Sequence, residues 1–409
     1  MVSTPLASSN TPVTTAGRPA RTATRATPWL AAVALILTAV NLRPAVTSIG
    51  PVLEEMRAGL GMSATVAGLL TSVPAFCFAL VGVTAPRLAR RFGVNAVILA
   101  GIAALTAGLA LRPLVGGPAP FVALTAVGLG GIALVNILMP VVVKQYFPGR
   151  VGPMTGVYTT ALNVGATAAA AVTVPISSAF GGWRSGLGMW AAVAAVALIP
   201  WLFLTRPRPA GTTAPAAAAP ARSLSRNPTA WALAVFFGLQ ATAAYVIMGW
   251  LPQMFRDAGL SASTAGLLFA VTSLLGVPLS YVLGALAGRL RSQSLLAAGL
   301  AVFGLAGYAG LLIAPAGAPW VWAVLLGMSN CSFPLALAMI GLRGRDAATV
   351  ARLSAFAQSA GYLLSIPGPV IVGALYQHTG QWHTPLVFLM VLMTIQLVAG
   401  LAAGRNRPL

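Results

Sequence analysis

The chain has 409 residues, of which 58% are hydrophobic and only 7% charged, whereas soluble domains carry roughly 25% charged residues. So few charged side chains exclude most water-soluble enzymes, because they cannot cover the surface of two or three soluble domains. The formal net charge is +20. Because the arginines stand in twos and threes between apolar segments, this charge indicates membrane topology rather than nucleic-acid binding.

The apolar segments predict an all-α polytopic membrane protein. About 20 apolar residues in a helix span the hydrocarbon core, and unpaired backbone amides in lipid exclude other conformations. The first segment, 1–27, is rich in Ser, Thr, Ala and Pro and is expected to form a disordered cytoplasmic tail. Twelve transmembrane helices follow, at about residues 29–52, 63–85, 94–111, 120–143, 153–179, 186–204, 230–252, 264–287, 294–313, 319–341, 353–376 and 385–402.

The distribution of charge predicts which way the spans face. With the N-terminus inside, the great majority of the basic residues fall in cytoplasmic segments, and three acids, Glu54, Glu55 and Asp257, fall outside. The positive-inside rule therefore favours a multi-pass protein of the bacterial cytoplasmic membrane, with both termini cytoplasmic. The basic residues expected on the outer side are Arg57, Arg112, Arg184 and Arg256.

An internal repeat divides the chain into halves. Residues 61–70 read GMSATVAGLL and residues 259–268 read GLSASTAGLL, with seven identities in ten at an offset of 198. An offset of six spans leaves both halves facing the same way, as in transporters with parallel repeats and a substrate site near the midplane. We therefore expect two pseudo-symmetric six-helix bundles. The predicted divisions are an N-terminal bundle at 28–204, a cytoplasmic linker at 205–228, a C-terminal bundle at 229–402 and a cytoplasmic tail at 403–409.

Two cytoplasmic loops at equivalent places in the halves share a pattern. Residues 86–93 read PRLARRFG and residues 284–291 read GALAGRLR. Both are similar to the signature loop of the major facilitator superfamily, which implies that fold for the whole chain. The residues that carry this resemblance are Arg90, Arg91, Gly93, Gly284 and Arg289. The acidic residue usual in the signature is replaced by Arg90 and Gly288, which argues against an aspartate-based cytoplasmic latch between the halves.

Four further motifs resemble one branch of that superfamily, the cyanate/nitroimidazole transporters. They read NLRPAVTSIGP at 41–51, WLP at 250–252, SFPLAL at 332–337 and ARLS at 351–354, the last followed by Gln358 and Tyr362. The resemblance implies a secondary transporter that moves a small anionic or polar planar solute by alternating access.

Arg43 is the strongest candidate for a functional residue. It lies about 14 residues, or roughly 21 Å, past the cytoplasmic end of the first span, near the middle of the bilayer. An arginine there costs about 2.5–3.5 kcal/mol, and no Asp or Glu falls inside a span to neutralise it. Snorkelling toward the outer face is the simpler alternative. We expect Arg43 to face the central cavity and to bind a carboxylate-like or polar group through its planar guanidinium.

Other polar and aromatic residues inside the spans complete the predicted substrate site. Asn163 and Gln358 each belong to a polar stripe at i, i+4 spacing, for which hydrogen bonding between helices is the alternative interpretation. The branch resemblance favours Tyr245 and Tyr362, whose rings suit a flat substrate. The remaining candidates are Asn41, Tyr158, Gln240, Trp250 and Asn330.

The expected partners are the lipid bilayer and a small-molecule substrate, without nucleic acid, cofactor or metal, and we expect a monomer. A coupling proton stays open, because no buried carboxylate supplies the usual relay. Glu54, Glu55, His378 and His383 are the residues left for such coupling, although solvated surface side chains are the simpler interpretation for them. Three alternatives to the proposed carrier stay open: a multidrug-type efflux carrier of the same superfamily, a channel and a polytopic membrane enzyme.

Overall fold

The computed structural model describes residues 28–205, 221–344 and 347–405. Within these ranges the chain is helical without strands, and 12 helical segments are long and apolar enough to cross a membrane. The predicted fold class is thereby confirmed. The tail predicted at 1–27, most of the linker and the last residues, 406–409, lie outside the described residues.

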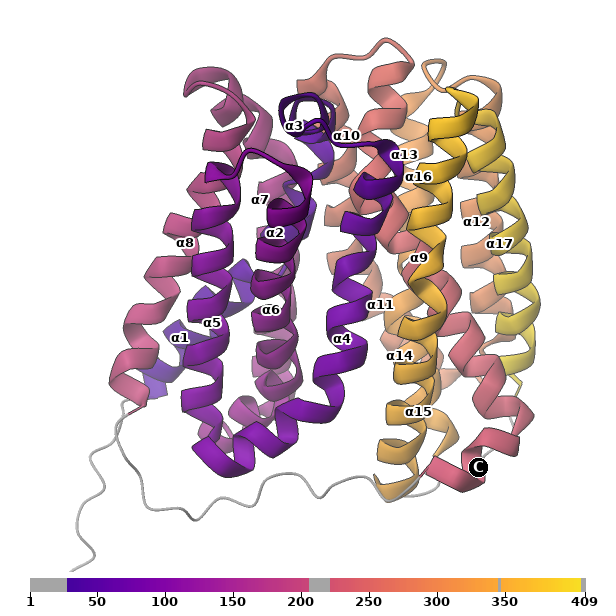
Figure 1. The fold of residues 1–409 in the computed structure, drawn as a ribbon. Coiled ribbons are helices and arrows are strands. Elements are labelled where there is room, and N and C mark those ends of the chain that lie inside the picture. Colours follow the sequence, from indigo (N-terminus) through magenta and orange to yellow (C-terminus); the bar gives the residue numbers. More distant parts are fainter. Residues whose placement is uncertain (1–27, 206–220, 345–346, 406–409) are drawn as a thin grey trace, which may run out of the picture.

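The first six spans form one bundle, the N-half, on the left of Figure 1. Its helices are α1 (Pro28–Asn41), α2 (Pro44–Thr47), η1 (Gly50–Val52), α3 (Leu53–Leu60), α4 (Ala64–Phe92), α5 (Val94–Leu111), η2 (Arg112–Leu114), α6 (Pro118–Tyr146), α7 (Val151–Ala179) and α8 (Trp183–Leu204).

The last six spans form the C-half, drawn from salmon to yellow in Figure 1. Its helices are η3 (Ala221–Arg226), α9 (Pro228–Asp257), α10 (Ala262–Leu274), α11 (Gly276–Arg289), α12 (Ser294–Ile313), α13 (Pro319–Asn330), α14 (Ser332–Arg343), α15 (Ala347–Ser365), α16 (Pro367–Thr379) and α17 (His383–Ala403).

Four of the spans are interrupted near their middles, which the sequence did not predict. The breaks lie at Leu42–Arg43, Leu275, Cys331 and Ile366. At two of them a proline opens the second helix: Pro44 and Pro367 stand in the first turns of α2 and α16. Proline is suited to this place because its missing N–H has no helical partner there. The broken helices leave backbone groups within the membrane that other residues must satisfy.

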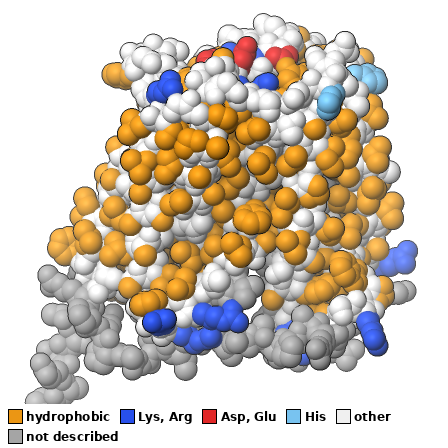
Figure 2. Space-filling view, in the orientation of Figure 1, with side chains coloured by type: hydrophobic (Ala, Val, Ile, Leu, Met, Phe, Trp, Pro, Cys, Tyr) orange, Lys and Arg blue, Asp and Glu red, His pale blue; other side chains and the backbone are white. Residues whose placement is uncertain are grey.

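The two ends of the molecule differ in charge, as Figure 2 shows for one face: Lys and Arg gather below an apolar band, and the red acidic side chains lie above it. We call the upper end, with Glu54, Glu55 and Asp257, the acidic end. The opposite end, where α1 begins and α17 finishes, is the basic end, and both signature loops lie there. This segregation agrees with the predicted alternation of the spans.

The halves contact each other closely toward the acidic end, through α4 against α15 and α16 and through α7 against α10. The internal repeat lies at this contact. A Cβ on Gly68 would stand 2.3 Å from the carbonyl oxygen of Pro369, and one on Gly266 would stand 2.8 Å from that of Ala170. Gly68 and Gly266 occupy equivalent positions of the repeat, so each half presents a bare backbone to the other.

The serines of the repeat explain why its helices begin where they do. The hydroxyl of Ser63 accepts a hydrogen bond from the backbone N–H of Val66, and that of Ser261 accepts one from Thr264. Each is therefore an N-cap, the first for α4 and the second for α10. The repeated sequence thus produces the same local structure in both halves: a capped helix N-terminus followed by a glycine that contacts the other half.

At the basic end the C-half has an apolar core of its own. Buried residues of this core, among them Phe236, Leu335 and Leu353, belong to the C-half alone. The hydrogen bonds, ring contacts and ion pairs that join the described parts of the two halves all lie from Tyr362 toward the acidic end. The described polar and ring contacts therefore join the bundles toward the acidic end.

Arg343 ties the C-half together at the basic end. Its buried guanidinium donates to Gln293 Oε1 at 2.6 Å, to the Gly404 carbonyl at 2.9 Å and to the Ala403 carbonyl at 3.3 Å. The last two carbonyls end α17 and have no helical donor, so the arginine caps this helix.

We expect Arg343→Ala to lower the stability of the C-half, at about 1–3 kcal/mol for each buried group left without a partner. The measurement is the thermal unfolding midpoint of the purified protein in detergent. Arg289→Ala is the matched control, because Arg289 is exposed at the same end. Equal midpoints for the two variants would contradict this role of Arg343.

Candidate functional site

Arg43 stands at the break in the first span. It precedes the four-residue helix α2, and its carbonyl accepts hydrogen bonds from the backbone N–H groups of Val46 and Thr47 and from the Thr47 hydroxyl. Its side chain is partly buried. Among the described residues the guanidinium has no hydrogen bond and no carboxylate partner. The break thus holds a free cation deep in the membrane-spanning part of the N-half.

Two tyrosines of the C-half lie within electrostatic range of Arg43. They are Tyr245 on α9 and Tyr362 on α15, whose hydroxyls both experience the charge of Arg43. Tyr245 is 9% exposed and lies near the middle of α9, roughly 18 Å from its acidic end. The structure therefore brings together three residues that the sequence singled out, from both halves, near the level of the bilayer centre.

Aromatic rings line the same region. The rings of Phe78 on α4 and Tyr362 stack across the two halves at 5.3 Å, and Phe237 on α9 meets Tyr362 edge-on at 5.0 Å. Phe78 was not predicted as a site residue, because a phenylalanine in an apolar span gives no signal that separates a lipid-facing from a partner-facing ring. Offset and edge-on rings of this kind present flat faces to which a planar solute can stack.

Two predicted amides lie on helices that contact the other half, α15 and α7. Gln358 lies one turn from Tyr362 on the same face of α15, and its side chain donates to Ser354 Oγ at 2.7 Å. Asn163 on α7 faces the other half, since a Cβ on Gly276 of α11 would lie 3.8 Å from its Oδ1. Its amide nitrogen bonds back to the Thr159 carbonyl at 3.1 Å, which leaves the amide oxygen toward α11. Tyr158, near Asn163 on the same helix, is half-buried against the apolar core.

No described contact links four further predicted site residues to Arg43. Asn41 is buried between α1 and α8, where its amide donates to the carbonyls of Leu37 and Val193. Gln240 is 3% exposed and lies one turn from both Phe236, which contacts Gly400 of α17, and Phe237, which contacts Tyr362. Asn330 is half-buried at the end of α13, and Trp250 lies near the acidic end of α9. The described contacts do not bring either residue to Arg43.

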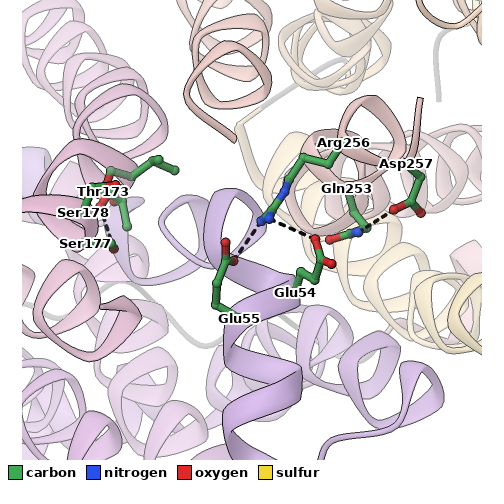
Figure 3. A network of polar contacts seen from close by, with 9 residues as sticks. Glu54, Glu55, Thr173, Ser177, Ser178, Gln253, Arg256 and Asp257 are labelled. Atoms are coloured by element: carbon green, nitrogen blue, oxygen red, sulfur yellow. Dashed lines mark hydrogen bonds and ion pairs between the residues drawn. The ribbon is translucent and has the colours of Figure 1, made fainter. Parts of the chain in front are cut away.

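An ion-pair network joins the halves at the acidic end (Figure 3). Arg256, at the end of α9, contacts Glu54 Oε2 at 2.9 Å and Glu55 Oε2 at 2.8 Å, both on α3 of the N-half. The two glutamates are exposed, as expected for solvated side chains, but they are also paired across the halves. Arg57 on α3 adds a second link, with its guanidinium 6.0 Å from the ring centroid of Tyr376 on α16.

Asp257 organises the C-half side of this network. Its carboxylate accepts hydrogen bonds at 2.7 Å from the side chains of Gln253, Tyr376 and Trp382. The last two rings stack at 4.3 Å, and both contact the ring of Trp250. Trp250 therefore belongs to an aromatic cluster that supports the closed acidic end.

The signature-loop residues that the sequence singled out lie at the basic end. Arg90, Arg91, Gly284 and Arg289 are exposed, and Gly93, with φ of 86°, forms the sharp turn between α4 and α5. All described carboxylates lie at the acidic end.

One residue expected in an outer loop is buried. Arg112, in η2, is 1% exposed and bonds to the backbone of the broken first span. Its position at the end of an apolar run predicts a loop residue, and only tertiary packing against Ala45 reveals its burial. Together with Arg256 and Phe78, it is a residue whose contacts no local pattern predicts.

Comparisons with known proteins agree with this architecture. The sequence model of the Major Facilitator Superfamily matches residues 29–342. The chain is 33% identical to the 2-nitroimidazole transporter of Escherichia coli (strain K12), over 92% of this chain and 95% of that protein. It is 28% identical to the cyanate transport protein CynX of the same organism, over 85% and 90% of the two chains.

Among solved structures, a variant of the nucleoside transporter NupG has a TM-score of 0.76 at 13% identity, covering 91% of this chain and 99% of that one. This likeness concerns the fold alone. The family match covers most of the chain, and the relatives extend over almost its whole length. The chain therefore belongs to the major facilitator superfamily and is a multi-pass membrane protein of this transporter family.

Proposed function

We propose that this protein is a secondary transporter of a small anionic or polar planar solute, cyanate- or nitroimidazole-like, and that it works by alternating access. The observation that carries the proposal is Arg43 at the break of the first span, without a partner among the described residues and with Tyr245 and Tyr362 of the opposite half within electrostatic range. Residues of both halves then meet one substrate, as alternating access requires.

The chemistry of the group supports a flat, electron-rich solute. The guanidinium of Arg43 offers a planar fork of donors for a carboxylate-like, nitro or cyanate group. The rings of Phe78 and Tyr362 offer apolar faces for stacking, and the amides of Gln358 and Asn163 offer polar contacts at the edges. Two of the relatives are named for 2-nitroimidazole and for cyanate, and both compounds fit this description.

The acidic-end contacts support a state in which one side is closed. Arg256 pairs with Glu54 and Glu55, and the repeat glycines bring the backbones of the halves together at the same end. We propose that the basic end faces the cytoplasm, in keeping with the positive-inside rule, so that both termini lie there. Substrate then exchanges with the cytoplasm in this state and with the exterior once the acidic-end contacts separate.

Two features bear on coupling and on the alternatives. The described spans place no carboxylate beside Arg43, so we propose no carboxylate proton relay at the site, and His378 and His383 lie at the acidic end away from it. A multidrug-type efflux carrier is a second candidate within the superfamily, which the aromatic rings at the site support but the positive charge of Arg43 does not.

Counterflow in proteoliposomes tests the proposal. Vesicles loaded with unlabelled cyanate or 2-nitroimidazole should accumulate the labelled compound transiently, at a rate that saturates with concentration. A channel gives flux without counterflow, and an enzyme gives a converted compound. Absence of counterflow for both compounds, with the protein folded and inserted, would overturn the proposed substrate class.

A further inference from the structure

Arg112 is a second cation buried in the N-half. Its Nη1 donates to the Ala45 carbonyl at 2.9 Å, and its Nη2 lies 3.4 Å from Ser48 Oγ. The guanidinium carbon lies 5.8 Å from the ring centroid of Phe121. Its Nε has no hydrogen-bond partner, and no described carboxylate pairs with it. Arg112 is thus a largely uncompensated charge in a water-poor part of the bundle.

The hydrogen bond to Ala45 connects Arg112 to the segment that carries Arg43. In a continuous helix the Ile49 amide would bond to the Ala45 carbonyl. Here the Ile49 amide bonds to Val46 and the Ser48 amide bonds to Pro44. The end of α2 therefore leaves the Ala45 carbonyl without a helical donor, and Arg112 supplies one, two residues after Arg43.

A neutral amide would satisfy that carbonyl at a far smaller desolvation cost than an unpaired guanidinium. The charge has an effect that the hydrogen bond alone does not. Glu54 and Glu55, the described acids of the N-half, are already paired with Arg256 at the acidic end. Arg43 and Arg112 therefore add their positive potentials around the break, where the low dielectric preserves them.

We propose that Arg112 is a specificity-determining positioning residue: it holds the break that carries Arg43, and its charge makes the site prefer an anionic over an uncharged solute. This inference rests on the proposed function and deepens it. An effective dielectric constant of about 20 and a separation on the order of 10 Å give roughly a tenfold contribution to that preference.

The test compares an anion and an uncharged solute in the same transporter. The KM for uptake of cyanate and of 2-nitroimidazole is measured in proteoliposomes at mildly acidic pH, where cyanate is ionised and the azole is mainly neutral. Arg112→Gln keeps a donor for Ala45 but loses the charge, and Arg112→Lys keeps both. Arg184→Gln is the matched control, because Arg184 also bonds a backbone carbonyl, that of Pro113 at 3.0 Å, but is exposed.

We expect Arg112→Gln to raise the KM for cyanate roughly tenfold relative to that for the azole, whereas Arg112→Lys and Arg184→Gln leave the ratio unchanged. Ser48→Asp provides an independent arm, because it sets a carboxylate beside Arg112 and should lower the anion preference with the arginine in place. Ser48→Asp also tests the effect of the Arg112 charge if Arg112→Gln does not fold.

Three results would overturn the inference. An equal rise of both KM values in Arg112→Gln and Ser48→Asp would assign Arg112 a structural role only. An unchanged ratio in both variants would remove the electrostatic role. If the wild-type protein carries neither compound, the proposed function itself fails, and this inference fails with it.

Discussion

Arg43→Ala should abolish transport while leaving the protein folded. Truncating one partner of a buried, hydrogen-bonded charge pair costs about 2–5 kcal/mol, so the affinity for an anionic solute should fall by roughly 30-fold to more than 1,000-fold. Arg43→Lys should also lose uptake, since a lysine ammonium keeps the charge but not the planar fork. The measurement is the initial rate of cyanate or 2-nitroimidazole uptake into proteoliposomes.

The control for this prediction is the stability of the protein, which should stay equal or rise while transport is lost. Removing an arginine from the bilayer relieves a cost of about 2.5–3.5 kcal/mol, and Arg43 has no described partner whose loss would offset this gain. The thermal midpoint of Arg43→Ala should therefore equal or exceed that of the wild type. Full uptake by Arg43→Ala would refute a substrate-binding role for this residue.

Arg256→Glu should open the acidic end. The substitution replaces two ion pairs with repulsion among three carboxylates on α3 and α9, at the place where the halves meet. Because Glu54 and Glu55 are 55% and 43% exposed, each lost pair contributes only about 0.2–1 kcal/mol. Repulsion adds to this loss, and we expect the open population to rise roughly tenfold, with a smaller effect at high salt.

A cysteine reporter measures that opening. Ser72 is buried and bonds to the Ile366 carbonyl across the halves, so Ser72→Cys should react with a soluble maleimide only when the acidic end separates. Cys77 and Cys331 are both buried free thiols and are replaced by serine in all variants. Glu54→Arg and Glu55→Arg together with Arg256→Glu should restore slow labelling. Equal labelling rates of Ser72→Cys with and without Arg256→Glu would show that these ion pairs do not hold the acidic end closed.

The features that the sequence predicted well are those with local signals. Long apolar runs and the segregation of arginines predicted the spans, and the repeat around Gly68 and Gly266 predicted the two halves. Arg43 was apparent because a charge inside an apolar run is conspicuous by itself. Its break was not, because a proline such as Pro44 only bends many membrane helices and interrupts others.

The residues that escaped prediction depend on partners distant in the chain. Arg256 pairs with Glu54 and Glu55 across 202 and 201 positions of sequence, and the buried Arg112 bonds to the Ala45 carbonyl, 67 positions earlier in the chain. Gln240 stays a prediction, because whether an amide inside a span faces the other half depends on the rotation of its helix, and this glutamine lies one turn from both Phe236 and Phe237.

The glycine contacts of the repeat have a consequence for the energetics of rocking. Gly68 and Gly266 place smooth backbone against backbone, so no side chain is locked into a socket that must be vacated when the halves part. When the halves separate at these glycines, the main loss is the dispersion attraction between two flat backbone surfaces. Contacts with lipid or water can partly replace that attraction. A bulky residue at either position would keep the halves apart at the acidic end. The protein would then favour the state that is closed at the basic end.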